Sequence, residues 1–376
     1  MFLTATNLPH YLLNRGSLRA SDVVDGDVCV TEAGRRNRNF KVVRGGARGF
    51  FVKQAPSRIA DATGSVNREA AVLHFAASHQ AFAPIAALAP AMIDYDPQRH
   101  ALTTELFERS ESLNELHGRV RSFPPDVARK TGAAIAAYHA AGSAIAGDAV
   151  AASFPRTPHW VFFVAQSGSD TLPGGTGGMP QVLASLRAMP DVAAALAALA
   201  AVWESTALIH GDVKWDNLLL VGDEPERELR IVDWELADIG DPAWDVACAL
   251  ASYLNWWLLA LPTDPSQPDL AAMIPHAPYP LPSAWPALAT LWTAYAERLG
   301  LDQERAERLF RRVVRFLGAR LVLTAFEVMQ GPVVMPAHAS LALRLAHTLL
   351  CYPDHAAVQM LGFANASGRV AMAGVA

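Results

Sequence analysis

The stretch HGDVKWDNLLLVGDEPERELRIVDWE, residues 210–235, contains two apolar runs separated by a polar turn. Such runs around Gly, Asp and Pro predict an antiparallel hairpin of residues 218–221 and 229–232. In this hairpin Asn217, which precedes the first strand, would face Asp233, which follows the second. Two oxygen ligands at one end of a hairpin form half of a Mg²⁺ site, which phosphate oxygens and water complete.

Asp212 precedes Asn217 by five residues in the same loop. A carboxylate beside a metal-bound phosphate can accept the proton of an incoming hydroxyl as the phosphoryl group is transferred. The alternative is that Asp212 caps a helix and Asp233 occupies a turn, where Asp is common. That explanation suits either residue alone, but the intact spacing of all three favours a phosphotransfer site.

Composition narrows the remaining classes of protein. The chain has 376 residues, of which 52% are hydrophobic and 18% charged, so disorder of the whole chain is excluded. The net charge of −5 is uneven, with +4 over residues 1–100, −8 over 101–240 and −1 over 241–376. No block is basic enough for a nucleic-acid groove, so we expect no nucleic-acid partner.

The cysteines and apolar runs indicate a cytoplasmic protein. Cys29, Cys248 and Cys351 have no short pairing or metal-type spacing, which argues against a disulfide framework. The first residues lack the basic start and apolar run of a signal peptide. The apolar runs 192–203 and 246–262 are too short to cross a membrane, and we interpret both as buried helices. We therefore expect no membrane partner.

The first hundred residues predict a small sheet. Residues 1–20 suit a helical lead-in, and 22–54 contain three strands separated by glycine-rich turns. Residues 65–79 have helical apolar spacing, and 91–107 suit two further strands. Together, residues 21–108 should form a mostly antiparallel sheet with one inserted helix.

The rest of the chain, residues 109–376, is alanine-rich and predominantly helical apart from the hairpin. The predicted helices are 126–142, 181–207, 285–299 and 302–330. Residues 167–180 suit a flexible glycine-rich connection, and 262–286 contain eight of the 25 prolines and suit a loop. The expected fold class is α+β.

Three motifs, HGDxxxxN (210–217), DWE (233–235) and GDPAWD (240–245), resemble the aminoglycoside phosphotransferase and choline kinase family. The resemblance extends from about residue 25 to about residue 255. It implies a two-lobed protein-kinase-like fold that uses ATP and Mg²⁺. The small β-rich N-lobe would be residues 21–108, and the larger helical C-lobe would begin at residue 109.

The resemblance also implies roles for individual residues. Asp212 would be the catalytic base, and Asn217 and Asp233 the Mg²⁺ ligands. His210 would support the catalytic loop. Asp241, followed by Pro242, suits the start of a helix and is interpreted as architectural.

A kinase of this type also needs a lysine–glutamate pair. Lys53 ends the strand GFFVK and is one of only four lysines. Glu69 lies on the inward stripe of the 65–79 helix, where a carboxylate needs a cation because an unpaired buried charge is costly. Lys53 would bridge Glu69 and the ATP phosphates. The alternative is a lysine that extends to solvent and a solvated glutamate.

The rest of the nucleotide site is placed by resemblance alone. In EAGRRNRNFKV (32–42), Gly34 and Asn37 would form a sparse phosphate-covering loop. The arginines of this loop either add positive charge near phosphate or coat the surface; they are Arg35, Arg36 and Arg38. TTELFE (103–108) would be the hinge, where backbone groups of Glu105 and Phe107 bind adenine.

Lys214 gives the loop a feature similar to that of Ser/Thr protein kinases. It follows Asp212 by two residues and could offset negative charge on the transferring phosphoryl group. The alternative is a solvent-facing loop lysine. Because 241–376 carry only −1, an acidic surface for polycationic aminoglycosides is not indicated. A cage for choline-type cations would need aromatic residues such as Trp244, Trp256 and Trp257, which also suit a core.

A narrower resemblance concerns NLPHYLLNRG (7–16), RRNRNFKVV (35–43) and FFVKQ (50–54). These segments are similar to the kinase subunits of class V lanthipeptide and thioamitide biosynthesis. They imply phosphorylation of Ser or Thr in a ribosomal precursor peptide, with a separate lyase as partner that eliminates the phosphate. The alternatives are a small-molecule kinase of the aminoglycoside or choline type, and a nucleotide-binding pseudo-kinase.

Overall fold

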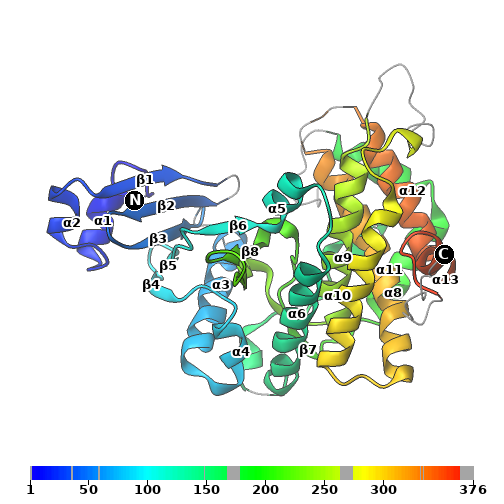
Figure 1. The fold of residues 1–376 in the computed structure, drawn as a ribbon, viewed down its shortest axis with the longest axis horizontal. Helices are drawn as coiled ribbons and strands as arrows, with labels where there is room; N and C mark the ends of the chain where they lie inside the picture. Colours follow the sequence, from blue (N-terminus) through cyan, green and yellow to red (C-terminus); the bar gives the residue numbers. More distant parts are fainter. Residues whose placement is uncertain are drawn as a thin grey trace. The chain divides into compact units, whose positions relative to one another are not determined.

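The computed structural model describes residues 2–34, 37–57, 60–147, 149–166, 178–262, 274–330, 332 and 334–364, without the side chains of 60–62. The chain divides into two compact units (Figure 1). Unit 1 comprises Met1–Arg119, Ala141–Pro155 and His210–Ile239, and unit 2 comprises Val120–Ala140, Arg156–Ile209 and Gly240–Ala376. The lobe boundaries expected from the sequence stay predictions.

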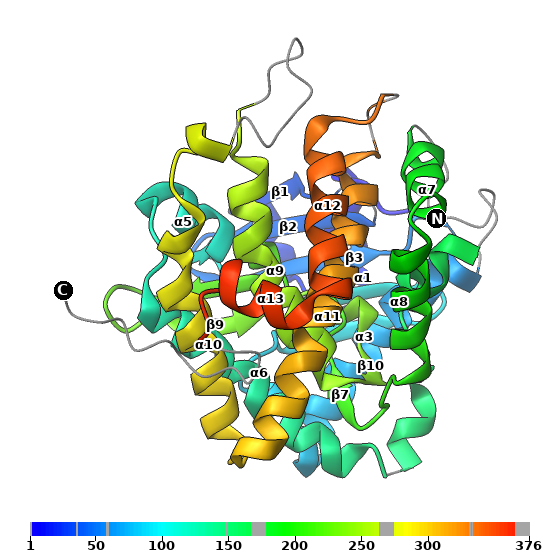
Figure 2. The ribbon, with the colours of Figure 1, turned by 90° about the vertical axis from the view of Figure 1, so that its right-hand side faces the viewer.

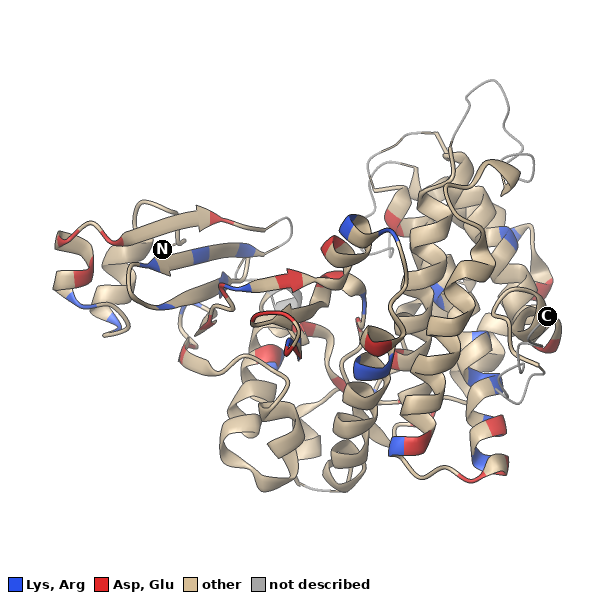
Figure 3. Ribbon diagram, viewed as in Figure 1, with Lys and Arg blue, Asp and Glu red and all other residues tan. Residues whose placement is uncertain are grey.

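Unit 1 is built on the antiparallel sheet that the sequence predicts. Its strands are β1 (Val28–Glu32), β2 (Arg38–Arg44), β3 (Ala47–Gln54), β4 (Met92–Asp96) and β5 (Ala101–Glu105). They lie in the order β1-β2-β3-β5-β4, and every neighbouring pair is antiparallel. The order places β3, which carries Lys53, in the middle of the sheet. Figure 3 shows basic residues along β2.

The lead-in consists of α1 (Leu8–Asn14) and α2 (Ala20–Val24). Leu8 and Leu12 of α1 are buried in one apolar cluster with residues of β2, β3 and β5. The expected strand from residue 22 was wrong at its start, because Val23 and Val24 belong to α2. The Asp22 carboxylate accepts a hydrogen bond from the Arg19 amide at 2.8 Å, which favours a helix start.

The helix inserted after β3 is α3 (Ala60–Ser78), and α4 (Ala83–Ala86) follows it. α3 begins five residues earlier than the predicted 65. Its buried side chains include Val66, Ala70 and Leu73, so its inward stripe is apolar as the spacing predicts. Glu69 lies on this stripe and is only 4% exposed.

The predicted hairpin is present, with a different register. Its strands are β8 (Leu218–Val221) and β9 (Glu228–Ile231), and β6 (Ser110–Ser112), which was not predicted, pairs with β8. Leu218 faces Ile231, and the Asn217 carbonyl accepts a hydrogen bond from the Val232 amide, so Asn217 faces Val232 and not Asp233. The prediction was wrong by one residue because the turn contains residues 222–227, one fewer than expected.

Unit 2 is helical in its described part. α5 (Leu113–Val120) and α6 (Pro125–Ile145) both cross the boundary between the units. The other helices are α7 (Met179–Arg187), α8 (Pro190–Ala201), α9 (Pro242–Leu259), α10 (Trp285–Arg298), α11 (Gln303–Val328), α12 (Ala337–Cys351) and α13 (Pro353–Gln359). α9 is buried along most of its length, and α11 packs against α9 and α12 (Figure 2). Charges of both signs lie on the first turns of α11 (Figure 3).

The single helix predicted over 181–207 was wrong. α7 ends at Arg187 and α8 begins at Pro190, because proline lacks the amide hydrogen that a helix interior needs. Ala207–Ile209 is a short strand, β7, and Asp238–Gly240 is another, β10.

Several further expectations concern loops, cysteines and tryptophans. Most of 167–180 and the part of 262–286 that covers 263–273 lie outside the described residues. None of the cysteines Cys29, Cys248 and Cys351, all of which the structure describes, forms a disulfide bond. The tryptophans Trp244 and Trp257 are buried, and the Trp244 ring packs among aromatic side chains of unit 2, so it belongs to the core and not to an exposed cage.

In the part of the chain that the structure describes, no single helix has the length and apolar composition needed to cross a membrane. α7 and α8 pass that test only as a pair, with a 96° bend between them.

Candidate active site

The structure brings Lys53 and Glu69 together in unit 1. Lys53 on β3 is 4% exposed, and its Nζ lies 2.5 Å from Glu69 Oε2 on α3. The same Nζ forms an ion pair with Asp233 and lies 3.5 Å from Glu235 Oε2. The predicted lysine–glutamate pair is therefore present, and two acidic residues from the segment after β9 extend it.

Burial and charge act in opposite directions in this cluster. Burial alone would lower the pKa of Lys53, but Glu69, Asp233 and Glu235 together raise it above its ordinary value. The lysine is therefore a permanent cation. Burial would raise the pKa of Asp233, but Lys53 beside it lowers the pKa below its usual range. For Glu69 burial dominates, and the pKa is raised.

The position of Asp233 depends on its backbone. Its φ of 70° and ψ of 54° lie in the left-handed region, which non-glycine residues rarely occupy and which Asp tolerates better than most. This conformation follows the last residues of the hairpin and precedes the short helix Trp234–Leu236 (η6). It explains why Asp233 reaches Lys53 although the hairpin register differs from the predicted one.

His210 supports the loop that contains Asp212, which the sequence analysis predicts to be the catalytic loop. Its Nε2 lies 3.0 Å from the Val232 carbonyl oxygen, and its Nδ1 lies 3.2 Å from the Asp212 amide nitrogen. Gly211 has a φ of +84°, and a Cβ at this position would lie 2.4 Å from the Leu236 carbonyl oxygen. Only glycine fits here. The imidazole and the glycine together hold the loop against the segment that carries Asp233.

Asp212, Lys214 and Asn217 form a second group in the same loop. Lys214 Nζ donates to Asp212 Oδ2 at 2.5 Å. Asn217 Nδ2 donates to the backbone oxygen of Asp212 at 2.9 Å and to its Oδ2 at 3.3 Å. Because the amide nitrogen of Asn217 faces Asp212, its Oδ1 is the atom that the predicted contact with Mg²⁺ would use. The loop thus presents one carboxylate with a fixed orientation.

The loop between β1 and β2 contains the other predicted nucleotide-binding residues. A Cβ on Gly34 would lie 2.5 Å from the Asn37 carbonyl oxygen, so the turn requires glycine. Asn37 Nδ2 donates to Glu235 Oε2 at 2.6 Å. Arg38 contacts the Leu3 carbonyl and the Phe2 ring, so it is not a phosphate-facing cation. Arg35 and Arg36 lie outside the described residues.

The predicted hinge residues follow directly from β5. The Glu105 amide donates to the Ala91 carbonyl at 3.0 Å, and the Phe107 carbonyl accepts a hydrogen bond from Ser110 Oγ at 2.6 Å. These two backbone groups are therefore engaged. The Glu105 carbonyl and the Phe107 amide are the groups left for the predicted contact with adenine.

Glu235 is a site residue that the sequence analysis missed. It lies against Lys53 and Asn37, and its carboxylate oxygen lies within 4.8 Å of those of Glu69 and Asp233. The signal was present in the motif DWE, where a second acid follows Asp233 by two residues. Two acids at this spacing after a strand can face the same ion.

The arrangement on this sheet and hairpin agrees with a comparison against known families. Residues 27–289 match the Phosphotransferase enzyme family, which is more than half of the chain. The chain belongs to this family. The matched range contains the loop of Asp212 and the segment of Asp233.

Similar proteins extend the comparison. Viomycin phosphotransferase from Streptomyces vinaceus is 33% identical over 121 residues, which is 30% of this chain and 38% of that protein. The chain thus matches well under half the length of this relative.

Among solved structures, an ethanolamine kinase from Plasmodium vivax has a TM-score of 0.56 at 12% identity, covering 92% of this chain and 89% of that one. A choline/ethanolamine kinase family protein from Mesorhizobium loti has a TM-score of 0.50 at 20% identity, covering 91% and 95%. These likenesses confirm the expected protein-kinase-like fold.

Proposed function

We propose that this protein is a kinase that transfers the γ-phosphate of ATP to a hydroxyl group in a Mg²⁺-dependent reaction. The observation that carries the proposal is the buried Lys53, paired with Glu69 and Asp233 within one unit. Such a lysine positions ATP phosphates, and its acidic partners keep it charged and oriented. The family match supports the same reaction class.

The residues around Lys53 fit a divalent cation. Glu69, Asp233 and Glu235 place carboxylate oxygens within 4.8 Å of one another, and Lys53 supplies one positive charge against these three acids. The excess negative charge favours a further cation, and hard divalent cations prefer oxygen ligands. We assign Asp233 and Asn217 as Mg²⁺ ligands and add Glu235. When bound, Mg²⁺ would offset the charge of the nucleotide phosphate oxygens.

Asp212 is the group we assign to the acceptor hydroxyl. Its Oδ2 accepts hydrogen bonds from Lys214 and Asn217, which orient the carboxylate. In that orientation it can take the hydroxyl proton. The side chain of Lys214 is 37% exposed, so its ammonium group can be reached by the transferring phosphoryl group and stabilise it.

The second part of the proposal concerns the molecule that accepts the phosphate. The short N-terminal resemblance predicts Ser or Thr of a precursor peptide, with a separate lyase as partner. The names of the similar proteins, viomycin phosphotransferase and ethanolamine kinase, favour the alternative, a small hydroxylated molecule. We therefore put a small-molecule alcohol first and keep the peptide as the competing acceptor.

The catalytic assignment is tested with Asp212→Asn. Asparagine keeps the shape of the side chain but cannot take a proton, so we expect phosphate transfer to fall by about 10²–10⁴-fold while ATP binding persists. The matched control is Asp216→Asn, an exposed acid in the same loop, which should retain near-normal turnover. Near-normal turnover of Asp212→Asn would remove its assignment as base.

The acceptor is tested with labelled ATP and Mg²⁺ against three groups of compounds. These are aminoglycosides and related antibiotics, amino alcohols such as choline and ethanolamine, and Ser/Thr-containing precursor peptides. Labelled small molecule supports the first choice, and labelled peptide supports the competing one. Absence of transfer to every compound, together with retained ATP binding, would argue for the nucleotide-binding pseudo-kinase alternative.

A further inference from the structure

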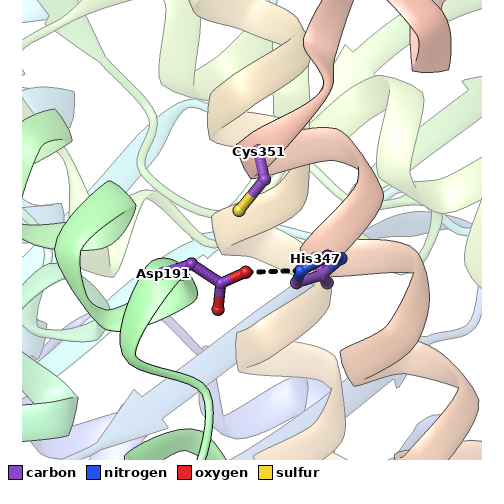
Figure 4. A group of neighbouring side chains, drawn as sticks. All are labelled: Asp191, His347 and Cys351. Atoms are coloured by element: carbon purple, nitrogen blue, oxygen red, sulfur yellow. Dashed lines mark hydrogen bonds and ion pairs between the residues drawn. The ribbon is translucent and has the colours of Figure 1, made fainter.

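A group of three potential metal ligands lies in unit 2, apart from the family motifs. Asp191 begins the first turn of α8, and His347 and Cys351 lie one turn apart near the end of α12. Figure 4 shows the three side chains pointing toward one another from the two helices. One ligand atom from each residue lies within 4.8 Å of the other two.

The contacts of these residues show that they already converge. His347 Nε2 lies 2.6 Å from Asp191 Oδ2, and the thiol of Cys351 interacts with the same carboxylate. α8 and α12 pack against each other, so the backbone holds the three side chains in register. The spacing of His347 and Cys351 by four residues puts both on one face of α12.

We propose that Asp191, His347 and Cys351 bind a Zn²⁺ ion that joins α8 to α12. A thiolate, an imidazole and a carboxylate are the ligand types that zinc takes, whereas Mg²⁺ and Ca²⁺ prefer oxygen alone. This inference does not depend on the proposed kinase reaction, because all three residues lie in unit 2 and none belongs to the candidate active site.

Charge and geometry both agree with zinc. With Asp191 and Cys351 ionised, the ligands carry two negative charges, which balance a divalent cation; Arg315 adds a nearby positive charge that works against binding. Zinc holds oxygen and nitrogen ligands at about 2.0–2.2 Å, so two tetrahedral ligands lie roughly 3.3–3.5 Å apart. The Asp191–His347 contact must therefore lengthen slightly. The exposed side chain of Asp191 can rotate to allow this.

The exposure of the group indicates how the coordination would be completed. The side chains of Asp191 and His347 are 53% and 31% exposed, so water can supply the fourth ligand. A catalytic Cys–His–Asp arrangement is a poorer explanation. His347 Nε2 faces Asp191 and not the thiol, so this nitrogen is not placed to take the proton of Cys351.

The test uses the full-length protein, stripped with a chelator and kept reduced with a phosphine. It is titrated with Co²⁺, a spectroscopic substitute for Zn²⁺, in excess Mg²⁺ so that the nucleotide site stays occupied by magnesium. We expect a thiolate-to-cobalt charge-transfer band that saturates at a single equivalent and disappears when Zn²⁺ is added. We also expect Zn²⁺ to raise the melting temperature.

The variants separate this site from other thiols. Cys351→Ser should abolish the band, and His347→Ala and Asp191→Asn should each weaken binding by at least about tenfold. Cys29→Ser, which removes an exposed thiol of unit 1, should leave the band unchanged. Circular dichroism of the metal-free variants checks that each one folds.

Three results would overturn the proposal: no band in the wild type, a band that survives in Cys351→Ser, or equal affinity in the wild type and every variant, which would mean an adventitious ion only. Kinase activity is read separately, and its loss or retention bears on the proposed function alone.

Discussion

Asp233 in unit 1 and Asp241 in unit 2 lie eight residues apart, and their surroundings move their pKa values in opposite directions. Lys53 lowers the pKa of Asp233 against the effect of burial. Burial raises the pKa of Asp241 to about 6, although Arg312 Nε lies 3.1 Å from its carboxylate. Lys53 thus stabilises the charged form of Asp233, whereas burial destabilises the charged form of Asp241.

The contacts of Asp233 and Asp241 indicate that the two residues have different roles. Asp241 accepts hydrogen bonds from the amides of Ala243 at 3.0 Å and Glu204 at 3.2 Å, so it caps α9, as its position before Pro242 predicts. Asp233 shares Lys53 with other acids and lies in a group that attracts cations. The same residue type thus has a proposed role in ligand binding at one position and an architectural role at the other.

The largest expected effect is on phosphate transfer, and it tests the assignment of Asp233 as a metal ligand. Asp233→Asn should lower kcat/KM for phosphate transfer by about 10²–10³-fold, because the variant loses a charged ligand of the phosphate-binding group. The melting temperature should fall only modestly, because the variant loses the ion pair between Asp233 and Lys53 while Lys53 keeps Glu69 and Glu235 as partners. The control is Asp223→Asn in the exposed hairpin turn, which should change neither quantity. A stable, fully active Asp233→Asn protein would contradict the metal assignment.

The second prediction concerns the pH dependence of stability at Asp241. Its folded pKa of about 6 lies above the value near 3.8 expected when unfolded, so the folded state holds the proton more tightly. Its contribution is complete below about pH 4 and is lost as the pH rises through about 6. Relative to Asp241→Asn, the wild-type free energy of unfolding should fall by roughly 2–3 kcal/mol over this range.

Urea unfolding of both proteins at several pH values measures the difference, and the subtraction removes the contribution of other groups. A difference that does not change with pH would mean that Arg312 compensates the buried charge of Asp241. The corresponding subtraction for Asp233→Asn should have the opposite sign. Because the folded pKa of Asp233 is lowered, its contribution is present above its unfolded pKa and is lost as the pH falls through the folded value.

The sequence predicts best those features that are determined within a short segment of the chain. The hairpin, the lysine–glutamate pair and the cap at Asp241 follow from spacing within short segments, and all three are present. The register that places Asp233 was missed by one residue, because it depends on the turn length and on a left-handed backbone conformation. The break at Pro190 was readable from the sequence but was overlooked.

Other features depend on segments that are far apart in the chain. Asn37 and Glu235 meet across 198 residues, and Asp191 and His347 across 156. No spacing rule connects such residues, because the fold alone brings them together. The contacts of Arg38 with Leu3 and Phe2 likewise depend on the fold. Sequence reasoning therefore found the residue types of the candidate active site more readily than their contacts.

The smallest expected effect concerns Asp245, a buried acid of unit 2 that accepts a hydrogen bond from a tyrosine. Tyr138 donates its hydroxyl to Asp245 Oδ2 at 2.6 Å, and His139 Nε2 lies 3.3 Å from the same oxygen. Burial and the charge of Asp245 raise the pKa of Tyr138, so it stays a neutral donor. Tyr138→Phe removes this donor and should lower the free energy of unfolding by about 1–2 kcal/mol.

Activity per folded molecule should not change in Tyr138→Phe, because Tyr138 and Asp245 both lie in unit 2, apart from the candidate active site. The matched control is Tyr352→Phe, whose ring is 58% exposed and whose effect on unfolding should stay within about 0.5 kcal/mol. Chemical unfolding and steady-state kinetics on the same preparations measure both quantities. If Tyr138→Phe lost activity without losing stability, Asp245 would belong with Asp233 as a functional acid, and burial in unit 2 would no longer identify an architectural acid.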